Sequence, residues 1–78
     1  MNKEDFYVGQ KIKLPQESYD YSWECYGDRL ADYATVCSLE SLDEHGLVHY
    51  EIEVLGNFVS TIHSGIHYSE IQKYEHHN

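Results

Sequence analysis

Two histidines and a glutamate near the C-terminal end have the spacing of a metal site. His63 and His67 are four residues apart, and Glu70 follows three residues later. On an α-helix this spacing would place two imidazoles and a carboxylate on one side, which is an arrangement able to hold Zn²⁺. Ser64 and Gly65 lie between the histidines and disfavour a helix. The sequence therefore predicts no metal ion or other cofactor, with His63, His67 and Glu70 as the alternative.

The two cysteines, Cys25 and Cys37, form no recognisable catalytic or metal-binding motif. They are too few for zinc held by four thiolates, and a reducing compartment keeps such thiols free. The chain contains no Gly-rich phosphate loop and no nucleophile elbow. With 78 residues it also has little room for a concave substrate pocket. We therefore predict that the protein is not an enzyme and has no catalytic residues.

Acidic residues recur every four positions in one part of the chain. They are Asp20, Glu24, Asp28 and Asp32, with Glu17 just before them. On a helix they would follow one slowly drifting face, about 6 Å apart per step. This spacing is within a factor of about two of the phosphate spacing along a nucleic-acid strand. The stripe predicts either a surface that docks on a basic patch or a solvated face that keeps a small domain soluble.

Aromatic residues are interleaved with these acids at Tyr19, Tyr21, Trp23 and Tyr26. Tyr and Trp are enriched at binding hot spots because they bury a large area at small entropic cost. Their rings also stack on guanidinium groups. The competing interpretation is that these rings fill the core of a chain with few large aliphatic side chains. We expect Trp23 in the core and Tyr21 at the surface.

The overall charge limits the class of partner. The chain has 5 Lys and Arg against 14 Asp and Glu, a net charge of −9 with histidine neutral. Such a surface repels phosphate backbones and anionic lipids, so we expect no direct nucleic-acid binding and no membrane binding. No apolar run approaches the roughly 18 to 20 residues of a membrane span, and the polar start is unlike a secretory signal. We expect a cytoplasmic protein of a bacterial cell or a phage-infected host.

Apolar and polar residues alternate in short segments, which predicts strands that position these groups in a single domain over residues 1–78. We expect strands at 8–14, 33–42, 47–54, 58–62 and 71–74. Val48, Tyr50, Ile52 and Val54 should face the core. Turns are expected at 43–46 and 56–57, a loop or single helical turn at 63–69, and a frayed tail at 75–78. Residues 18–33 fit a helix and a structured loop equally well, because aromatic side chains recur at helical spacing but Gly27 interrupts them.

Several segments together suggest a known family. They are Val8 to Leu14, Ala34-Thr35-Val36, the 47–54 strand, and Thr61-Ile62-His63 followed by Ser69-Glu70-Ile71. In these segments the chain resembles the small SH3-like and KOW-like β-barrels of bacteria and phages. The resemblance implies a mainly β fold, a five-stranded antiparallel barrel with a long aromatic and acidic insert after the first strand. Family roles include RNA or ribosome contact and protein docking, and this chain lacks the basic face of the nucleic-acid branch.

The sequence therefore predicts an acidic protein-binding module. Its simplest form is a small inhibitor, of phage counter-defence or immunity type, that covers a basic, nucleic-acid-facing surface of a target protein. The predicted partner-binding residues are Glu17, Tyr19, Asp20, Tyr21, Trp23, Glu24, Tyr26, Asp28 and Asp32. The alternatives are a structural or regulatory adaptor that binds through a strand edge or loops, and a His-based metal-binding domain. A free strand edge would also permit a homodimer.

Overall fold

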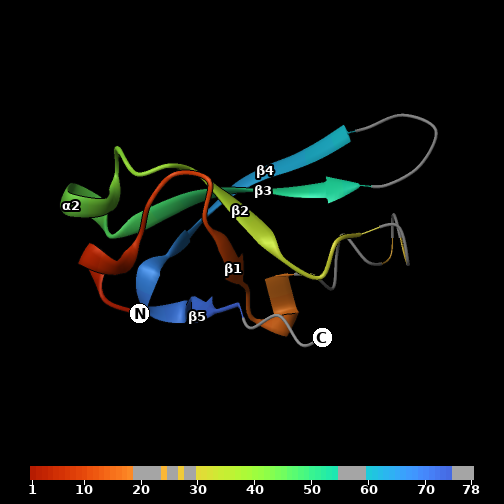
Figure 1. The fold of residues 1–78 in the computed structure, drawn as a ribbon, viewed down its shortest axis with the longest axis horizontal. Coiled ribbons are helices and arrows are strands. Elements are labelled where there is room, and N and C mark those ends of the chain that lie inside the picture. Colours follow the sequence, from red (N-terminus) through yellow and green to blue (C-terminus); the bar gives the residue numbers. More distant parts are fainter. Residues whose placement is uncertain (19–23, 25–26, 28–29, 55–59, 75–78) are drawn as a thin grey trace.

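A single antiparallel sheet of five strands organises the protein in a computed structural model that describes residues 1–18, 24, 27, 30–54 and 60–74. The strands are β1 (Lys11–Lys13), β2 (Ala34–Ser38), β3 (Leu47–Val54), β4 (Ser60–His67) and β5 (Gln72–Lys73). Their order in the sheet is β4-β3-β2-β1-β5, so the last strand lies beside the first (Figure 1). The mainly β prediction with five antiparallel strands is confirmed.

Short helical turns lie outside the strands, and residues 16–18 after β1 are also helical. A 3-10 turn, η1 (Lys3–Asp5), precedes β1, and a second, η3 (Tyr68–Glu70), separates β4 from β5. One α-helical turn, α2 (Leu42–His45), joins β2 to β3. None of the helices in the described part of the chain has the length and apolar character needed to cross a membrane.

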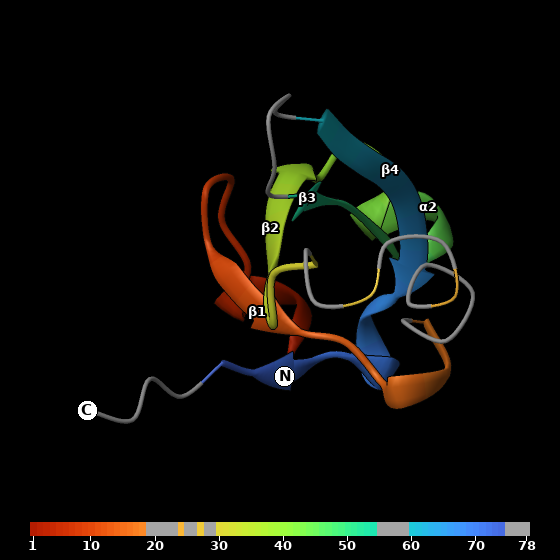
Figure 2. The ribbon, with the colours of Figure 1, turned by 90° about the vertical axis from the view of Figure 1, so that its right-hand side faces the viewer.

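The sheet is curved (Figure 2). Its core lies on one face, because the buried residues of β3 alternate with half-buried ones. Val48, Tyr50, Ile52 and Val54 of β3 are all buried, which confirms the predicted alternation along this strand. The largest fully buried side chains are Ile12, Val36, Val48 and Ile52. Further buried side chains come from outside the central strands: Phe6, Leu14, Leu42, Ile66 and Ile71.

Strand β1 is shorter than the predicted 8–14 strand. Gly9 has a φ of +92° and turns the chain just before β1. The Gln10 side chain accepts a hydrogen bond from the Tyr7 N–H and donates one to the Asp5 carbonyl. Tyr7 and Val8 are exposed as a result. The error arose because Val8 was counted as a strand residue, whereas the turn at Gly9 removes it from the sheet.

Strand β4 is longer than the sequence indicates, and the loop or helical turn predicted at 63–69 is wrong over its first part. Pairing with β3 is continuous from Val54↔Ser60 to Leu47↔His67. Ile66 is buried on the core face, which holds the second half of β4 in the sheet. The helical turn begins only at Tyr68.

The turn predicted at 43–46 is α2, which Gly46 terminates. Gly46 has a φ of +70° and its N–H donates to the Leu42 carbonyl. A Cβ at this position would lie 2.6 Å from Nε2 of His67. Only glycine satisfies both the left-handed backbone and the close approach of the His67 ring.

The long segment between β1 and β2 is attached to the sheet at its far end. Leu30 forms an isolated antiparallel bridge with Val54, and the Ala31 N–H donates to the Glu53 carbonyl. The predicted sites at Tyr19, Asp20, Tyr21, Trp23, Cys25, Tyr26 and Asp28 lie outside the described residues, as do the 56–57 turn and the 75–78 tail.

Candidate functional site

The face of the sheet opposite the core carries a cluster of three potential ligand side chains. Cys37, Glu51 and His63 come from β2, β3 and β4, three strands that are neighbours in the sheet. Glu51 lies opposite His63 in the β3–β4 ladder, so strand pairing brings the two side chains together. Cys37 lies where the β2–β3 register shifts between Val36 and Ser38, as at a β-bulge.

The three side chains are within reach of one another. His63 Nε2 lies 3.2 Å from Glu51 Oε1. One ligand atom from each of the three residues lies within 4.8 Å of the other two. Cys37 is a free thiol and is half-buried, whereas the His63 and Glu51 side chains are 62% and 35% exposed. The cluster therefore opens to solvent on the His63 side.

The surroundings of Cys37 shift the pKa of its thiol upward. Partial burial and the negative charge of Glu51 raise its pKa, while a backbone hydrogen bond acts in the opposite direction. A cation placed between Cys37 and Glu51 would reverse the effect of the carboxylate, because it would favour the thiolate.

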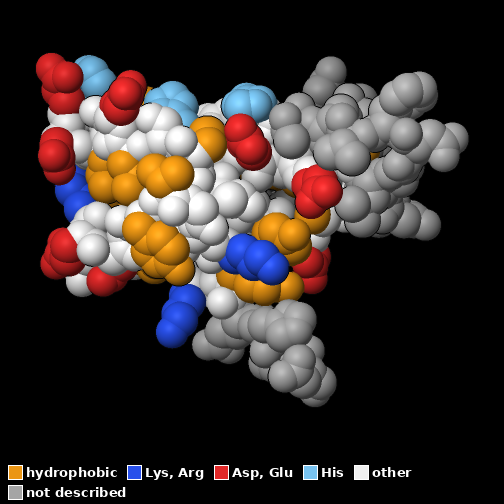
Figure 3. All heavy atoms as spheres, turned by 45° about the horizontal axis from the view of Figure 1, so that its top comes forward, with side chains coloured by type: hydrophobic (Ala, Val, Ile, Leu, Met, Phe, Trp, Pro, Cys, Tyr) orange, Lys and Arg blue, Asp and Glu red, His pale blue; other side chains and the backbone are white. Residues whose placement is uncertain are grey.

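A shallow hollow surrounds this cluster. Its lining residues are Cys37, Ser38, Glu40, His49, His63, Ser64 and Gly65. The His49 ring packs over Gly65, where a Cβ would lie 3.3 Å from its ring atoms. Figure 3 shows histidine side chains in a row on the surface, with acidic side chains beside them. The lining of the hollow thus combines a thiol, two imidazoles and the Glu40 carboxylate.

The structure separates the residues of the predicted metal site. His63 and His67 share the outer face of β4, but four residues of strand put them about 13 Å apart along the chain. The His67 ring lies against Tyr68, with Nδ1 2.8 Å from Ser69 Oγ. Glu70 is exposed in η3. Within the described residues, the cluster able to hold a metal contains His63 but neither His67 nor Glu70.

Of the predicted partner-binding residues, Glu17, Glu24 and Asp32 fall in the described part of the chain, and all are exposed. The Asp32 carboxylate lies 3.4 Å from the Tyr74 hydroxyl. The Tyr74 ring is 5.5 Å from that of Tyr33, and Lys11 Nζ lies 4.5 Å above the Tyr33 ring. Partial desolvation and the Asp32 carboxylate raise the pKa of the Tyr74 phenol.

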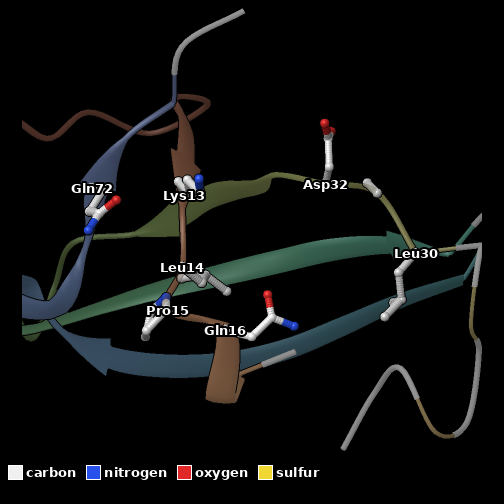
Figure 4. A pocket seen from close by; sticks show the side chains of 8 residues that line it. Lys13, Leu14, Pro15, Gln16, Leu30, Asp32 and Gln72 are labelled. Atoms are coloured by element: carbon white, nitrogen blue, oxygen red, sulfur yellow. The ribbon is translucent and has the colours of Figure 1, made fainter. Parts of the chain in front are cut away.

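A second hollow lies between the end of β1 and the far end of the insert (Figure 4). Leu14 and Leu30 supply its apolar side chains, while Lys13 and Asp32 supply charges of opposite sign. Asp32, one of the predicted partner-binding residues, therefore lies beside the apolar side chains of Leu14 and Leu30.

Negative charge on the described surface is not neutralised by basic side chains. The exposed acids are Glu4, Asp5, Glu17, Glu24, Asp32, Glu40, Asp43, Glu44 and Glu70. Within the described residues, two carboxylates have a close basic side chain, and in each case that side chain is a histidine: Glu44 with His45 and Glu51 with His63. Neither pair involves Lys or Arg. Lys3 and Lys11 instead lie over the rings of Tyr68 and Tyr33.

Comparison of the chain with family models, curated proteins and solved structures finds no match.

Proposed function

We propose that this protein is an acidic binding module that covers a basic, nucleic-acid-facing surface of another protein, as a small inhibitor or antagonist does. The observation that carries the proposal is the set of exposed carboxylates without Lys or Arg partners in the described residues, on a chain of net charge −9. Carboxylates that have no basic partner among the described residues are suited to the Lys and Arg side chains of another protein.

The proposed fold is an SH3-like barrel. The order β4-β3-β2-β1-β5 supports it, because the last strand returns to pair with the first. The turn η3 directly before β5 supports it as well, since the resemblance includes a short turn before the last strand. The long β1–β2 insert carries the acidic and aromatic residues of the proposed interface.

The binding mechanism is electrostatic attraction followed by aromatic docking. Complementary charge raises the association rate and fixes orientation, and it weakens as salt screens the charges. The exposed carboxylates of Glu17, Glu24 and Asp32 would supply part of the negative charge. Leu14 and Leu30, which line the same hollow as Asp32, would supply apolar contact. The tyrosines and Trp23 of the insert are proposed as the anchors that determine the dissociation rate.

The test compares two variants with the same change in net charge. One combines Glu17→Gln, Glu24→Gln and Asp32→Asn, and the matched control combines Glu4→Gln, Asp43→Asn and Glu70→Gln. Partners are captured from nuclease-treated host lysate at about 50 mM and about 500 mM salt, conditions that differ strongly in screening. Each partner is then purified and assayed for nucleic-acid binding in the presence of this protein.

The proposal expects a partner that is lost at high salt and whose nucleic-acid binding this protein blocks. The insert variant should lose that inhibition, and the control should keep it. Inhibition that survives the insert variant at both salt concentrations would contradict the proposal. A loss that is equal in both variants would assign the effect to net charge instead of the insert.

A second candidate function is an adaptor that binds through a strand edge. Strand β4 pairs with β3 along its whole length and has no second strand neighbour within the described residues. Such an edge is a template for an added strand. Binding of this kind relies on backbone hydrogen bonds, so the complex should persist at both salt concentrations and in the insert variant.

A further inference from the structure

The cluster of Cys37, Glu51 and His63 combines three side chains that transition metals accept as ligands. Zn²⁺ binds thiolate, imidazole and carboxylate in the same site. Hard cations such as Mg²⁺ and Ca²⁺ prefer oxygen ligands alone, so a thiol and an imidazole beside one carboxylate select against them. The donor set therefore favours Zn²⁺.

The distances between the ligand atoms of Cys37, Glu51 and His63 are close to those between the ligands of a tetrahedral zinc site. Bonds of about 2.0 to 2.3 Å in a tetrahedron place neighbouring ligand atoms about 3.3 to 3.6 Å apart. The Glu51 Oε1 to His63 Nε2 distance is 3.2 Å, and the Cys37 sulfur lies within 4.8 Å of both partners' ligand atoms. The His63 side chain is 62% exposed, so it has room to rotate toward the other two ligands.

The charges of the cluster match a divalent cation. A thiolate and a carboxylate carry two negative charges, and neutral imidazole adds none, so Zn²⁺ would be neutralised at the site. Glu40, which lines the same hollow, adds further negative potential. No Lys or Arg side chain lines this hollow among the described residues. The local field thus attracts cations.

From these observations we propose that Cys37, Glu51 and His63 form a Zn²⁺ site on the outer face of the sheet. Three protein ligands leave a fourth position, which the hollow opens to solvent beside His49. The metal would join β2, β3 and β4 on the face opposite the core. Because only the folded chain brings these three strands together, zinc binding would stabilise the fold. The site is separate from the acidic insert and does not depend on the proposed function.

Cobalt titration of the metal-free, reduced full-length protein tests the site, since Co²⁺ bound by a thiolate gives a charge-transfer absorption band in the near ultraviolet. We expect one Co²⁺ per chain with this band, and displacement of the cobalt by Zn²⁺. Cys37→Ser should abolish the band. Glu51→Gln and His63→Ala should each weaken cobalt binding by more than about tenfold, the range seen when even supporting groups of a metal site are lost.

Three control variants separate this site from other ligands. Cys25→Ser removes the other thiol. The double variant His76→Ala/His77→Ala removes the two consecutive histidines near the end of the sequence. His45→Ala removes an exposed histidine outside the cluster. All three should keep the thiolate band and the cobalt affinity. Zinc should also raise the melting temperature of the native chain, and His63→Ala should remove that increase.

The His63 variant keeps the test decisive even if Cys37→Ser fails to fold, because the His63 side chain is mostly exposed and does not support the core. Absence of a thiolate band in the native chain would overturn the proposal. A band that is lost with Cys25 and kept without Cys37 would do the same. Cobalt binding that disappears only in the tail variant would also overturn it.

Discussion

His63 lies directly opposite Glu51 across the β3–β4 ladder, and its Nε2 is 3.2 Å from the Glu51 carboxylate. The pair is partly solvated, with side chains 62% and 35% exposed. Ion pairs in such surroundings contribute little, because solvent screens the attraction and ordering the side chains is unfavourable. The pair by itself therefore adds little to stability. Together with the thiol of Cys37 it forms a group of three side chains that could hold a metal ion.

This relationship predicts that the pair matters for stability only when metal is bound. In the presence of a chelator, Glu51→Gln should change the free energy of unfolding by less than about 1 kcal/mol. With saturating Zn²⁺, the native chain should become more stable than the variant by a larger margin, because the variant binds the metal more weakly. Urea denaturation with and without Zn²⁺ measures both values. A large loss of stability in chelator would indicate that the pair supports the fold by itself.

The core side chain Ile12 should be among the most sensitive positions for folding. It is fully buried in the three-residue strand β1, which pairs with both β2 and β5. We expect Ile12→Ala to lower the free energy of unfolding by about 2 to 5 kcal/mol, through lost burial and an unfilled cavity. The matched control is Val8→Ala, because Val8 is 63% exposed. Its effect should stay within about 0.5 kcal/mol. Equal losses in the two variants by urea denaturation would contradict the assigned core.

Strand β3 shows how much of the fold the sequence predicts. From Val48 to Val54 its residues alternate between apolar and polar types, and both the bounds and the buried face of the strand agree with the structure. For β4 the sequence predicts only the first part, as a strand at 58–62. The second part is not predicted, because His63, Ser64 and Gly65 have weak strand preferences and resemble a loop. What holds them in the sheet is pairing with β3, which is a tertiary effect that no local pattern contains.

The candidate site was missed for the same reason. The predicted set of His63, His67 and Glu70 rests on the residue spacing of a helix. On a strand the same spacing moves the side chains of His63 and His67 apart. Cys37 and Glu51 are distant from His63 in sequence, and strand register brings them together. A signal does exist, because the alternation that turns Val48, Tyr50, Ile52 and Val54 to the core places Glu51 on the outer face of β3. Without knowledge of which residue of β4 it faced, that signal could not identify a partner.

Gly46 should be more sensitive to substitution than Gly9, although both have positive φ angles. An alanine Cβ at Gly46 would lie 2.6 Å from Nε2 of His67, whereas at Gly9 it would meet nothing within 4 Å. Gly9→Ala therefore introduces backbone strain alone, about 1 to 2 kcal/mol. Gly46→Ala adds a steric clash, and the loss in the free energy of unfolding should exceed that of Gly9→Ala.

The double variant Gly46→Ala/His67→Ala isolates the clash. Removing the ring should recover the steric part of the loss and leave the backbone strain, so its stability loss should approach that of Gly9→Ala. Thermal and urea denaturation of the native chain, the three single variants and the double variant give the comparison. Gly46→Ala should cost less stability in the His67→Ala background than in the native chain. If the two losses are equal, the His67 ring is not the group that excludes a side chain at Gly46.

Tyr74 should make the fold sensitive to alkaline pH. Partial desolvation and the nearby Asp32 carboxylate raise the pKa of its phenol above the ordinary value of 10.0. A group whose pKa is higher in the folded state binds its proton more tightly there, so its stabilising contribution is present below pH 10. That contribution is lost as the pH rises through the folded-state pKa. Asp32→Asn removes the negative charge and should move the Tyr74 titration to lower pH.

Difference absorbance of phenolate formation measures this shift, with Tyr74→Phe subtracted so that the other tyrosines cancel. The fall in melting temperature above pH 10 should be smaller in Tyr74→Phe than in the native chain, because the variant has no phenol to deprotonate at this position. An unchanged Tyr74 titration in Asp32→Asn would mean that partial desolvation and the neighbouring Tyr33, without Asp32, raise the pKa. In that case the contact between Asp32 and Tyr74 carries no electrostatic coupling.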